Sequence, residues 1–547
     1  MPNQAAATGA LPEIFQEAAR LGGTLSILGD STEETRSHRE VADLAALRAG
    51  GLADKGIGRG DRVCLFARTS FDFVADLLAV WHVGAVAVPL PIPPRFLATD
   101  NWMDQAEAQI RNSRAACMLL AGDDPEPPST KVVRAEDLEA TGTYDGPGPT
   151  AEDVALIQWS SGSTSRPKGV ILTHRAIAAH LELNREHVLH FGPGPVFSWL
   201  PLYHDAGLLV YLLTPLSGGA TLTMLRTDSF LARPLRWLEE MDRTRAHVCC
   251  APTFGYALAA RALEGTEDTL DLSSWKQAYI GAEPIDVRTV KRFLRAAEPH
   301  GFDARAMLPG YGLAEATCTV TVGVPMQGIR IDTIDRSALA MGEAKPASRD
   351  TPGAADVVSV GVPAGDMEVI VVDTGDHELP DRGVGEVLVR GSSLMEGYLK
   401  DAEATRAALA NGWLHTGDRG YLADGELFIT GRIKDVIVVR GRNHHAEDLE
   451  QIVLALPDVR PGACVCIGID DEGSNPLVVI AESDAAGDPN RVQEIRDRIV
   501  RRIWSEAGLR TKEVVLLPRR SLPKTTSGKL QRVRARQMYH SGVWDQA

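Results

Sequence analysis

The sequence lacks the excess of positive charge that proteins use to bind nucleic acids or anionic membranes. Its 547 residues carry 57 Lys+Arg and 73 Asp+Glu, which gives a formal net charge of -16 at pH 7. This balance argues against either of those partners. Cysteine is scarce as well. The seven cysteines are odd in number and scattered, so we expect free thiols in a reducing cytoplasm and no disulfide framework.

Long apolar runs are also missing. Residues 1–16 have neither a basic start nor an apolar stretch, so we do not expect them to act as a signal peptide. The longest uncharged stretch, residues 206–225, contains Pro215, Gly218 and Gly219. It predicts a helix, a turn and a strand rather than a membrane span. The chain shows no internal repeat and no low-complexity tract.

Helical and strand patterns alternate in the first part of the chain. Residues 37–55 and 71–83 have apolar side chains at helical spacing, and residues 62–67 predict a short buried strand. This alternation predicts an α/β fold with mixed sheets covered by helices. Residues 123–153 are rich in Pro, Gly and acidic residues and predict a surface connection around a weak helix. A chain of this length also needs two or more domains.

Basic residues are concentrated near the C-terminus. Residues 491–536 carry 14 Lys+Arg and 4 Asp+Glu, a balance of +10, so the remainder of the chain sums to -26. A basic helix face is usually solvated surface, but it can also dock an acidic partner. Both interpretations stay open at this point.

A hydroxyl-rich turn at residues 159–169 is the most informative motif. It reads Trp-Ser-Ser-Gly-Ser-Thr-Ser-Arg-Pro-Lys-Gly and lies between two apolar runs, so it predicts a strand–loop–strand unit. Closely spaced hydroxyls and backbone N–H groups predict a cradle for phosphate oxygens, with a plain Ser/Gly hairpin as the alternative. It is not a Walker loop, because Pro167 rather than Gly precedes Lys168 and Gly169 follows it.

Further motifs follow this turn. They are Tyr-Gly-Leu-Ala-Glu-Ala-Thr at 311–317, Thr-Gly-Asp at 416–418, Gly-Arg-Ile-Lys-Asp at 431–435 and Pro-Lys-Thr-Thr-Ser-Gly-Lys at 523–529. In this order and at these separations, the set resembles the adenylate-forming superfamily of acyl-CoA synthetases, peptide-synthetase adenylation domains, luciferases and fatty acyl-AMP ligases. The resemblance covers roughly residues 35–535. It implies a large N-terminal ATP- and acyl-binding domain, residues 1–433, and a small mobile α+β domain, residues 434–547, that carries the catalytic lysine.

The reaction that the resemblance implies is attack of a carboxylate on the α-phosphate of ATP, with release of pyrophosphate. Two anions must meet, so the site has to supply positive charge and hydrogen-bond donors. Tyr311 would stack on adenine, while Asp418 and Arg432 would bind the ribose. The full set of implied ATP-binding residues is Ser160, Ser161, Gly162, Ser163, Thr164, Lys168, Gly281, Ala282, Glu283, Tyr311, Gly312, Asp418 and Arg432.

Three residues are the implied catalytic set. Glu315 occupies the place of a magnesium-binding carboxylate, with a helix-capping acid as the alternative. Lys529, on a Gly-flanked loop, would bridge the substrate carboxylate and the phosphates, unless it is an ordinary surface lysine. His204 would gate the acyl site beside the carboxylate, or else it is structural. The implied acyl-binding residues are Trp199, Tyr203, His204 and Ala206.

Lys434 takes the implied hinge position between the two domains. Ser165 departs from the family pattern, which has Gly there, and this puts the shape of the phosphate loop in doubt.

Three features resemble the fatty acyl-AMP ligase branch. Segments 199–207 and 310–317 look like the versions of that branch. The run Arg-Gly-Arg-Asn-His at 440–444 is similar to its signature, although His445 and Ala446 replace the usual Tyr-Pro. The interval between Glu315 and Gly361 is long, and the extra residues near 328–354 match the position of a branch-specific insertion.

The sequence therefore predicts an ATP- and Mg²⁺-dependent cytoplasmic ligase that converts a fatty or other hydrophobic carboxylic acid to acyl-AMP. The expected acceptor is the phosphopantetheine thiol of an acyl carrier protein. An acyl-CoA ligase is the alternative, and a non-catalytic binder is less favoured because Lys529 and Glu315 are both present.

Overall fold

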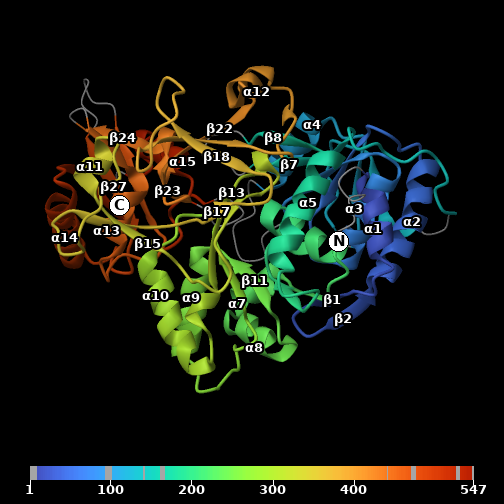
Figure 1. The fold of residues 1–547 in the computed structure, drawn as a ribbon, viewed down its shortest axis with the longest axis horizontal. Helices are drawn as coiled ribbons and strands as arrows, with labels where there is room; N and C mark the ends of the chain where they lie inside the picture. Colours follow the sequence, from blue (N-terminus) through green and yellow to red (C-terminus); the bar gives the residue numbers. More distant parts are fainter. Residues whose placement is uncertain are drawn as a thin grey trace.

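The computed structural model describes residues 9–92, 102–122, 124–138, 142–160, 167–439, 442–469, 476–524 and 530–544. The N-terminal helices and the C-terminal region lie at opposite ends of the long axis of the molecule (Figure 1). Among the described residues, no helix is long and apolar enough to cross a membrane.

One large sheet has nine strands in the described part of the chain. Its six central strands are parallel, and the outer strands β2, β14 and β17 run antiparallel to their neighbours. In spatial order the strands are β2 (Glu33–Ser37), β1 (Thr24–Leu28), β10 (Leu222–Leu225), β9 (Val196–Ser198), β11 (Val248–Ala251), β12 (Gln277–Ile280), β13 (Met307–Gly312), β14 (Thr319–Val322) and β17 (Val362–Pro363). Beside it lie α7 (Thr227–Ala232), α8 (Leu235–Thr244), α9 (Thr253–Glu264) and α10 (Val287–Ala297) (Figure 1).

A second sheet has seven strands within the described ranges and is parallel over its first five. The order is β6 (Val132–Arg134), β5 (Cys117–Leu120), β3 (Arg62–Phe66), β4 (Val86–Leu90), β7 (Val154–Trp159), β8 (Gly169–Thr173) and β20 (Gly397–Tyr398). Helices cover both faces of this sheet. Alternate residues of its strands point to opposite faces, and they pack with these helices in two separate apolar clusters. The covering helices are α1 (Leu11–Ala18), α2 (His38–Asp54) and α3 (Phe71–His82) on one face and α4 (Trp102–Ser113) on the other.

The predicted α/β class and the predicted first elements are confirmed. Helix α2 begins at a capping box: the Ser37 hydroxyl accepts from the Glu40 backbone N–H, and the Glu40 carboxylate accepts from the Ser37 N–H. The connection at 123–153 has one element that was not predicted. Its residues Val132–Arg134 form edge strand β6, followed by a short 3-10 helix at Ala135–Leu138.

A third sheet lies between the large sheets and the C-terminal region. Its strands are β18 (Glu368–Val372), β19 (Gly385–Arg390), β22 (Trp413–Ala423), β21 (Leu409–Ala410) and β23 (Glu426–Arg432), with helix α12 (Ala402–Ala408) beside it. The stretch predicted as an insertion forms strand β15 (Ile331–Asp335), helix α11 (Arg336–Ala340) and strand β16 (Ala354–Val358). Ile334 and Leu339 of this stretch pack against Tyr421 and Phe428 of the third sheet.

Residues 437–544 form apolar clusters of their own. Strands β26 (Cys464–Gly468), β27 (Leu477–Glu482) and β28 (Thr511–Leu517) form a sheet with α13 (Ala446–Leu454) and α14 (Pro489–Ala507) on one face and α15 (Arg532–His540) on the other. Strands β24 (Val436–Val439) and β25 (Arg442–His445) form a hairpin at its start. All seven cysteines are free thiols, as expected. We refer to residues 434–547 as the small domain; this boundary stays a prediction.

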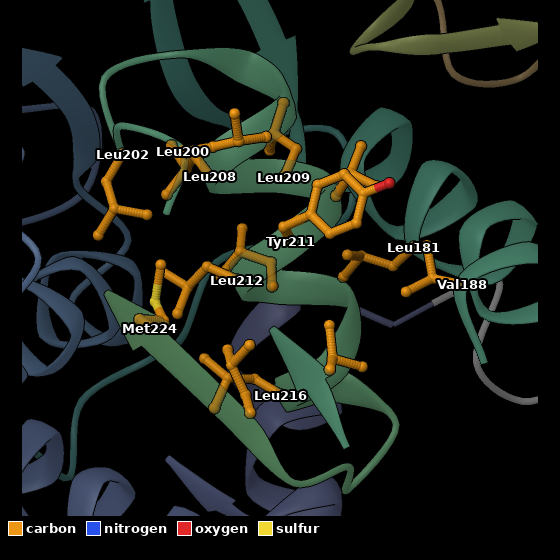
Figure 2. Packing of buried hydrophobic residues seen from close by; sticks show 14 of the residues in the cluster. Leu181, Val188, Leu200, Leu202, Leu208, Leu209, Tyr211, Leu212, Leu216 and Met224 are labelled. Carbon is orange, nitrogen blue, oxygen red and sulfur yellow. The ribbon is translucent and has the colours of Figure 1, made fainter. Parts of the chain in front are cut away.

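The stretch 206–225 forms a helix, a turn and a strand, as predicted, but the helix begins as a π-helix. Residues Ala206–Leu213 are the π-helix, α6 (Thr214–Ser217) continues it directly, and α5 (His174–Val188) packs beside it. Figure 2 shows its apolar side chains meeting those of α5 and β10; the labelled residues include Leu181, Val188, Leu208, Leu209, Tyr211, Leu212 and Met224.

Candidate active site

The hydroxyl-rich turn joins two antiparallel strands, as predicted. Strands β7 and β8 pair, and the Ser160 N–H donates a 2.9 Å hydrogen bond to the Lys168 carbonyl, which closes the hairpin. Ser161, Gly162, Ser163, Thr164 and Ser165 lie outside the described residues. Ser160 and Lys168 are therefore the described ends of the predicted phosphate cradle.

Lys168 and Glu315 both contact Tyr398. The Lys168 ammonium lies over the Tyr398 ring, 4.2 Å from its centroid, and the Tyr398 hydroxyl donates a 2.8 Å hydrogen bond to Glu315 Oε1. Glu315 sits in a short 3-10 helix, Ala314–Ala316, that directly follows β13. The fold thus joins the expected magnesium carboxylate and the expected phosphate-binding lysine through one aromatic side chain.

Tyr311, Asp418 and Arg432 form a connected group. The Tyr311 hydroxyl donates to Asp418 Oδ2 at 2.6 Å, and Arg432 Nε lies 2.9 Å from Asp418 Oδ1. Asp418 and Arg432 face each other on β22 and β23, so the sheet register fixes this pair. The Asp418 residue is 4% exposed. Burial raises the pKa of Asp418 above its usual value, while Arg432 and the Tyr311 hydrogen bond oppose that rise.

The charges of Asp418 and of Glu315 both act on Arg432. Asp418 first, and then Tyr311 and Glu315, raise the pKa of Arg432. Asp418 is thus more than an ordinary turn residue, because it is buried, paired and held on a strand. Each of its oxygens has two acceptor positions, so it retains capacity for ribose hydroxyls.

Gly281, Ala282 and Glu283 form the turn that follows β12. A side chain on Gly281 would run into the Gly310 carbonyl at the end of β13, so this close approach requires glycine. Ala282 adopts a left-handed conformation with φ of 64°. The Glu283 carboxylate accepts a 2.9 Å hydrogen bond from the Phe254 N–H in the first turn of α9. Glu283 therefore caps a helix, whereas contact with ATP stays a prediction for all three residues and for Gly312.

The segment of the predicted acyl gate is hydrogen-bonded to strand β7 of the β7–β8 hairpin. Gln158 of β7 donates a 2.8 Å hydrogen bond to the Tyr203 carbonyl. His204 Nδ1 lies 2.5 Å from Asp205 Oδ1 and 3.3 Å from the Ala206 backbone nitrogen, so two neighbouring groups contact this side of the ring. The Ala206 N–H also donates to Asp205, at 2.7 Å, where the π-helix begins. His204 is thus held in one orientation at the start of the apolar π-helix.

Trp199 lies deeper than the other predicted acyl-binding residues. It is 1% exposed, and its ring stacks on Phe230 with centroids 3.8 Å apart, within a buried aromatic cluster that also contains Trp237. Among the described side chains, no contact joins Trp199 to His204. Its role as a pocket wall stays a prediction, as do those of Tyr203 and Ala206.

The predicted hinge segment contacts an arginine that the sequence analysis did not single out. Lys434 is exposed in a 3-10 helix, Ile433–Asp435, while its neighbour Asp435 is buried. Arg532 donates to Asp435 and lies 3.0 Å from Glu450 and 3.4 Å from Glu447. Burial, and then Glu450 and Asp435, raise the pKa of Glu447 to about 7, while Arg532 opposes that rise.

Lys529, the predicted catalytic residue, lies outside the described residues. The described residues on either side are held together: Lys524 and Leu530 form a β-bridge, and the Gln531 N–H donates to the Pro523 carbonyl at 2.9 Å. Arg532 follows at the start of α15. Lys524 and Leu530 therefore lie side by side, close in sequence to the arginine that contacts the predicted hinge segment.

The insertion contacts the small domain. Arg336 of α11 donates through Nε to both oxygens of Asp448 on α13, at 2.8 and 3.0 Å, and lies 3.9 Å from Glu506 on α14. Arg288 of α10 donates to the Gln451 side chain and backbone, both at 3.0 Å. The small domain is therefore held against both the insertion and α10 in this arrangement.

Tyr398 and Arg532 could not be found from the sequence. The hydrogen-bond partner of Tyr398 lies 83 residues earlier, and the nearest partner of Arg532 in sequence lies 82 residues earlier. Neither residue belongs to a stretch whose spacing or composition distinguishes it. Only the Arg532 neighbourhood offered a signal, because it follows the lysine motif directly.

Comparison with known proteins gives similar chains over nearly the whole length. The model of the AMP-binding enzyme family matches residues 15–399. A Caulobacter vibrioides protein provisionally named an acyl-CoA synthetase is 32% identical, over 97% of this chain and 95% of its own length. The medium-chain-fatty-acid–[acyl-carrier-protein] ligase JamA of Moorena producens is 33% identical, over 95% and 92%. A solved structure from a study of fatty acyl-adenylate ligases of E. coli and L. pneumophila superposes with a TM-score of 0.91 at 32% identity, covering 99% of this chain and 100% of that chain.

Proposed function

The chain belongs to the family of AMP-binding enzymes, and on that premise we propose that it activates a fatty or other hydrophobic carboxylic acid as acyl-AMP and releases pyrophosphate. One observation carries the proposal: Tyr311, Asp418 and Arg432 bond to one another, and Glu315 lies in the short helix that comes after the strand of Tyr311. This arrangement supports a nucleotide site at the first group and a metal-binding role for Glu315. The apolar π-helix that begins beside His204 supports a hydrophobic acyl group.

Magnesium fits the carboxylate that the site offers. Mg²⁺ is usually held by one or two carboxylates plus substrate phosphates, and no cluster of three or more ligating side chains exists in the described ranges. Glu315 would supply the protein ligand, because Tyr398 engages only its Oε1 oxygen. When bound, the ion would neutralise charge that develops on the phosphates.

The other proposed roles belong to side chains of the protein itself. Lys168 would neutralise the leaving phosphates, and Asp418 would accept hydrogen bonds from the ribose hydroxyls. His204 would lie beside the incoming carboxylate, with its orientation fixed by Asp205. Lys529 would bridge the carboxylate and the α-phosphate, and Lys434 would mark the hinge about which the small domain moves.

The proposed acceptor is the phosphopantetheine thiol of an acyl carrier protein. The carrier-protein ligase JamA supports this assignment, and so does the contact between Arg336 and Asp448, which ties the small domain to the insertion. A small domain held in this way would resist the movement that an enzyme needs to present a second, thioester-forming face. An acyl-CoA ligase is the second candidate, favoured by the relative from Caulobacter.

The basic residues of 491–536 divide between two faces of the small domain. On α14, Arg498 pairs with Asp458 and Arg502 with Glu506. On α15, Arg534 and Arg536 are exposed and have no ion-pair partner among the described residues. Because α15 also follows directly on the lysine motif, it is the face on which an acidic carrier would dock closest to the reaction.

The experiment that tests the proposal is ATP–pyrophosphate exchange across a panel of carboxylic acids of increasing chain length. CoA and a phosphopantetheinylated carrier protein are then offered separately as acceptors. Exchange with medium or long hydrophobic acids, and acyl transfer to the carrier but not to CoA, is the expected result. No exchange with any acid would refute adenylation, whereas rapid acyl-CoA synthesis would favour the second candidate.

A further inference from the structure

Tyr398 belongs to none of the motifs in the sequence, yet it is rigidly placed in the site. It lies on β20, which pairs antiparallel with β8. The N–H groups on either side of it are bonded to β8, since Glu396 donates to the Ile171 carbonyl at 2.9 Å and Leu399 to the Gly169 carbonyl at 2.8 Å. The N–H of Tyr398 itself donates to Thr405 Oγ1 at 2.9 Å. Its backbone therefore cannot shift without breaking the sheet edge.

The ring and the hydroxyl of Tyr398 contact two different residues. The ring face carries the Lys168 ammonium at 4.2 Å, within the range of a cation–π contact. The hydroxyl donates to Glu315 Oε1 at 2.8 Å. Tyr398 is 9% exposed, so water does not screen either contact fully.

The Tyr398 hydroxyl is the donor of this bond, because an ionised carboxylate oxygen can only accept. A carboxylate that accepts one hydrogen bond at Oε1 is fixed in rotation about its last bond, so Oε2 keeps a defined direction. Among the described residues, Glu315 Oε2 and the Lys168 ammonium have no hydrogen-bond partner, so both are available to a ligand.

We propose that Tyr398 is a positioning residue that orients Glu315 for the metal ion and holds Lys168 over its ring until the nucleotide phosphates bind. This inference rests on the proposed adenylation function. A cation–π contact is weaker than a charge-assisted bond from lysine to phosphate, so ATP would draw Lys168 off the ring. A lysine held in this way loses little side-chain freedom when the substrate arrives.

Two substitutions separate the two roles. Tyr398→Phe keeps the ring but removes the hydrogen bond to Glu315, whereas Tyr398→Leu removes both. The matched control is Tyr421→Phe, because the Tyr421 hydroxyl also donates to a carboxylate, Asp332 Oδ2, at 2.9 Å, and its ring stacks on Phe428 away from Glu315. Thermal melting of all three variants reports the loss of stability that any buried hydroxyl would cause.

The first measurement is the binding of Mn²⁺, as a probe for the metal ion, by electron paramagnetic resonance in the presence of ATP. Tyr398→Phe should weaken Mn²⁺ binding about tenfold, the size expected for one hydrogen bond to a charged group. Tyr421→Phe should leave Mn²⁺ binding unchanged. Equal Mn²⁺ binding in wild type and Tyr398→Phe would overturn the orienting role.

The second measurement is the NMR spectrum of the reductively ¹³C-methylated protein, with the Lys168 resonance assigned from Lys168→Arg. A cation over a ring face is shifted upfield, so the wild type and Tyr398→Phe should show the shift and ATP should remove it. An unshifted Lys168 resonance in the wild type would overturn the holding role, even if Tyr398→Leu does not fold. Both measurements need no turnover, so they give an answer whether or not pyrophosphate exchange is found.

Discussion

The Tyr311 hydroxyl donates a 2.6 Å hydrogen bond to Asp418 across 107 residues of sequence. This bond joins the end of β13 to β22, so two different sheets meet at the proposed nucleotide site. Arg432 engages the other oxygen of Asp418 and completes the group. Because the three side chains hold one another, the proposed ribose site would need little further ordering when a nucleotide binds.

Asp418→Ala should raise the KM for ATP roughly tenfold and change kcat much less. Ribose contacts are made in both the ground state and the transition state, so their loss removes mainly uniform binding. Tyr311→Phe keeps an aromatic ring and should change the KM for ATP less. Steady-state pyrophosphate exchange at varied ATP measures both variants. A normal KM with a collapsed kcat would show that Asp418 has another role.

Lys529→Ala should abolish acyl-AMP formation with little change in thermal stability. Removing one preorganised charge from a reacting phosphate typically lowers the rate ~10²–10³-fold. Lys524→Ala is the matched control, because Lys524 is an exposed lysine of the same motif and its removal should leave exchange near the wild-type rate. Unchanged exchange in Lys529→Ala would contradict the catalytic assignment.

The buried group of Arg532, Glu447 and Glu450, next to the predicted hinge, predicts a pH dependence of stability. The pKa of Glu447 is raised to about 7, so between its usual value and pH 7 the folded state binds a proton that the unfolded state has released. The free energy of unfolding should therefore fall as pH rises through this window and level off above it. Glu447→Gln mimics the protonated side chain and should flatten the profile. Thermal melts of both proteins from pH 5 to 8 decide this; parallel profiles would count against it.

Local patterns predicted much of the fold. Residues 37–55 gave a helix because Ser37 and Glu40 form a complete capping box, and the phosphate turn gave a hairpin because two apolar runs flank it. The π-helix at Ala206–Leu213 was not predicted beyond its helical character. A π-helix differs from an α-helix in its hydrogen-bond spacing, which apolar periodicity over eight residues does not distinguish.

The candidate site was predictable only where residues lie in motifs. Asp418 and Arg432 were assigned to one ribose, and the register of β22 and β23 indeed pairs them. Tyr398 and Arg532 were missed because each acts through partners more than eighty residues away. The basic segment was likewise described as one feature, whereas a sheet divides it into two faces.

Charge reversal on α15 should weaken acyl transfer to a carrier protein without affecting adenylation. Arg534→Glu with Arg536→Glu changes the charge of the proposed docking face. The matched control is Arg501→Glu with Arg510→Glu, an equal change at exposed arginines of α14 and the residue before β28. Transfer rates at rising salt should fall for wild type and stay low for the α15 variant. If the transfer rate does not depend on salt, or if both double variants lose the same fraction of it, α15 is not the docking face.

Breaking the contact between the insertion and the small domain should increase CoA thioester formation. Deleting residues 330–349 is a poor test, because Ile334 and Leu339 are buried against the third sheet and their loss would open a cavity. Arg336→Ala removes only the bonds to Asp448 and the nearby Glu506. The small domain would then move more freely, and the ratio of acyl-CoA to acyl-AMP should rise roughly fivefold, as expected for the loss of one partly screened ion pair.

Arg330→Ala controls for the insertion itself. Arg330 pairs with Asp424 and Glu426 at the third sheet and makes no hydrogen bond or ion pair with the described residues of the small domain, so its loss should leave the product ratio unchanged. Chromatography of products formed from ATP, a hydrophobic acid and CoA measures all three proteins. If Arg336→Ala and Arg330→Ala change the ratio equally, the insertion acts through its own stability and not by holding the small domain. If the wild type already makes acyl-CoA rapidly, the contact does not restrain the domain at all, and the carrier-protein assignment gives way to an acyl-CoA ligase.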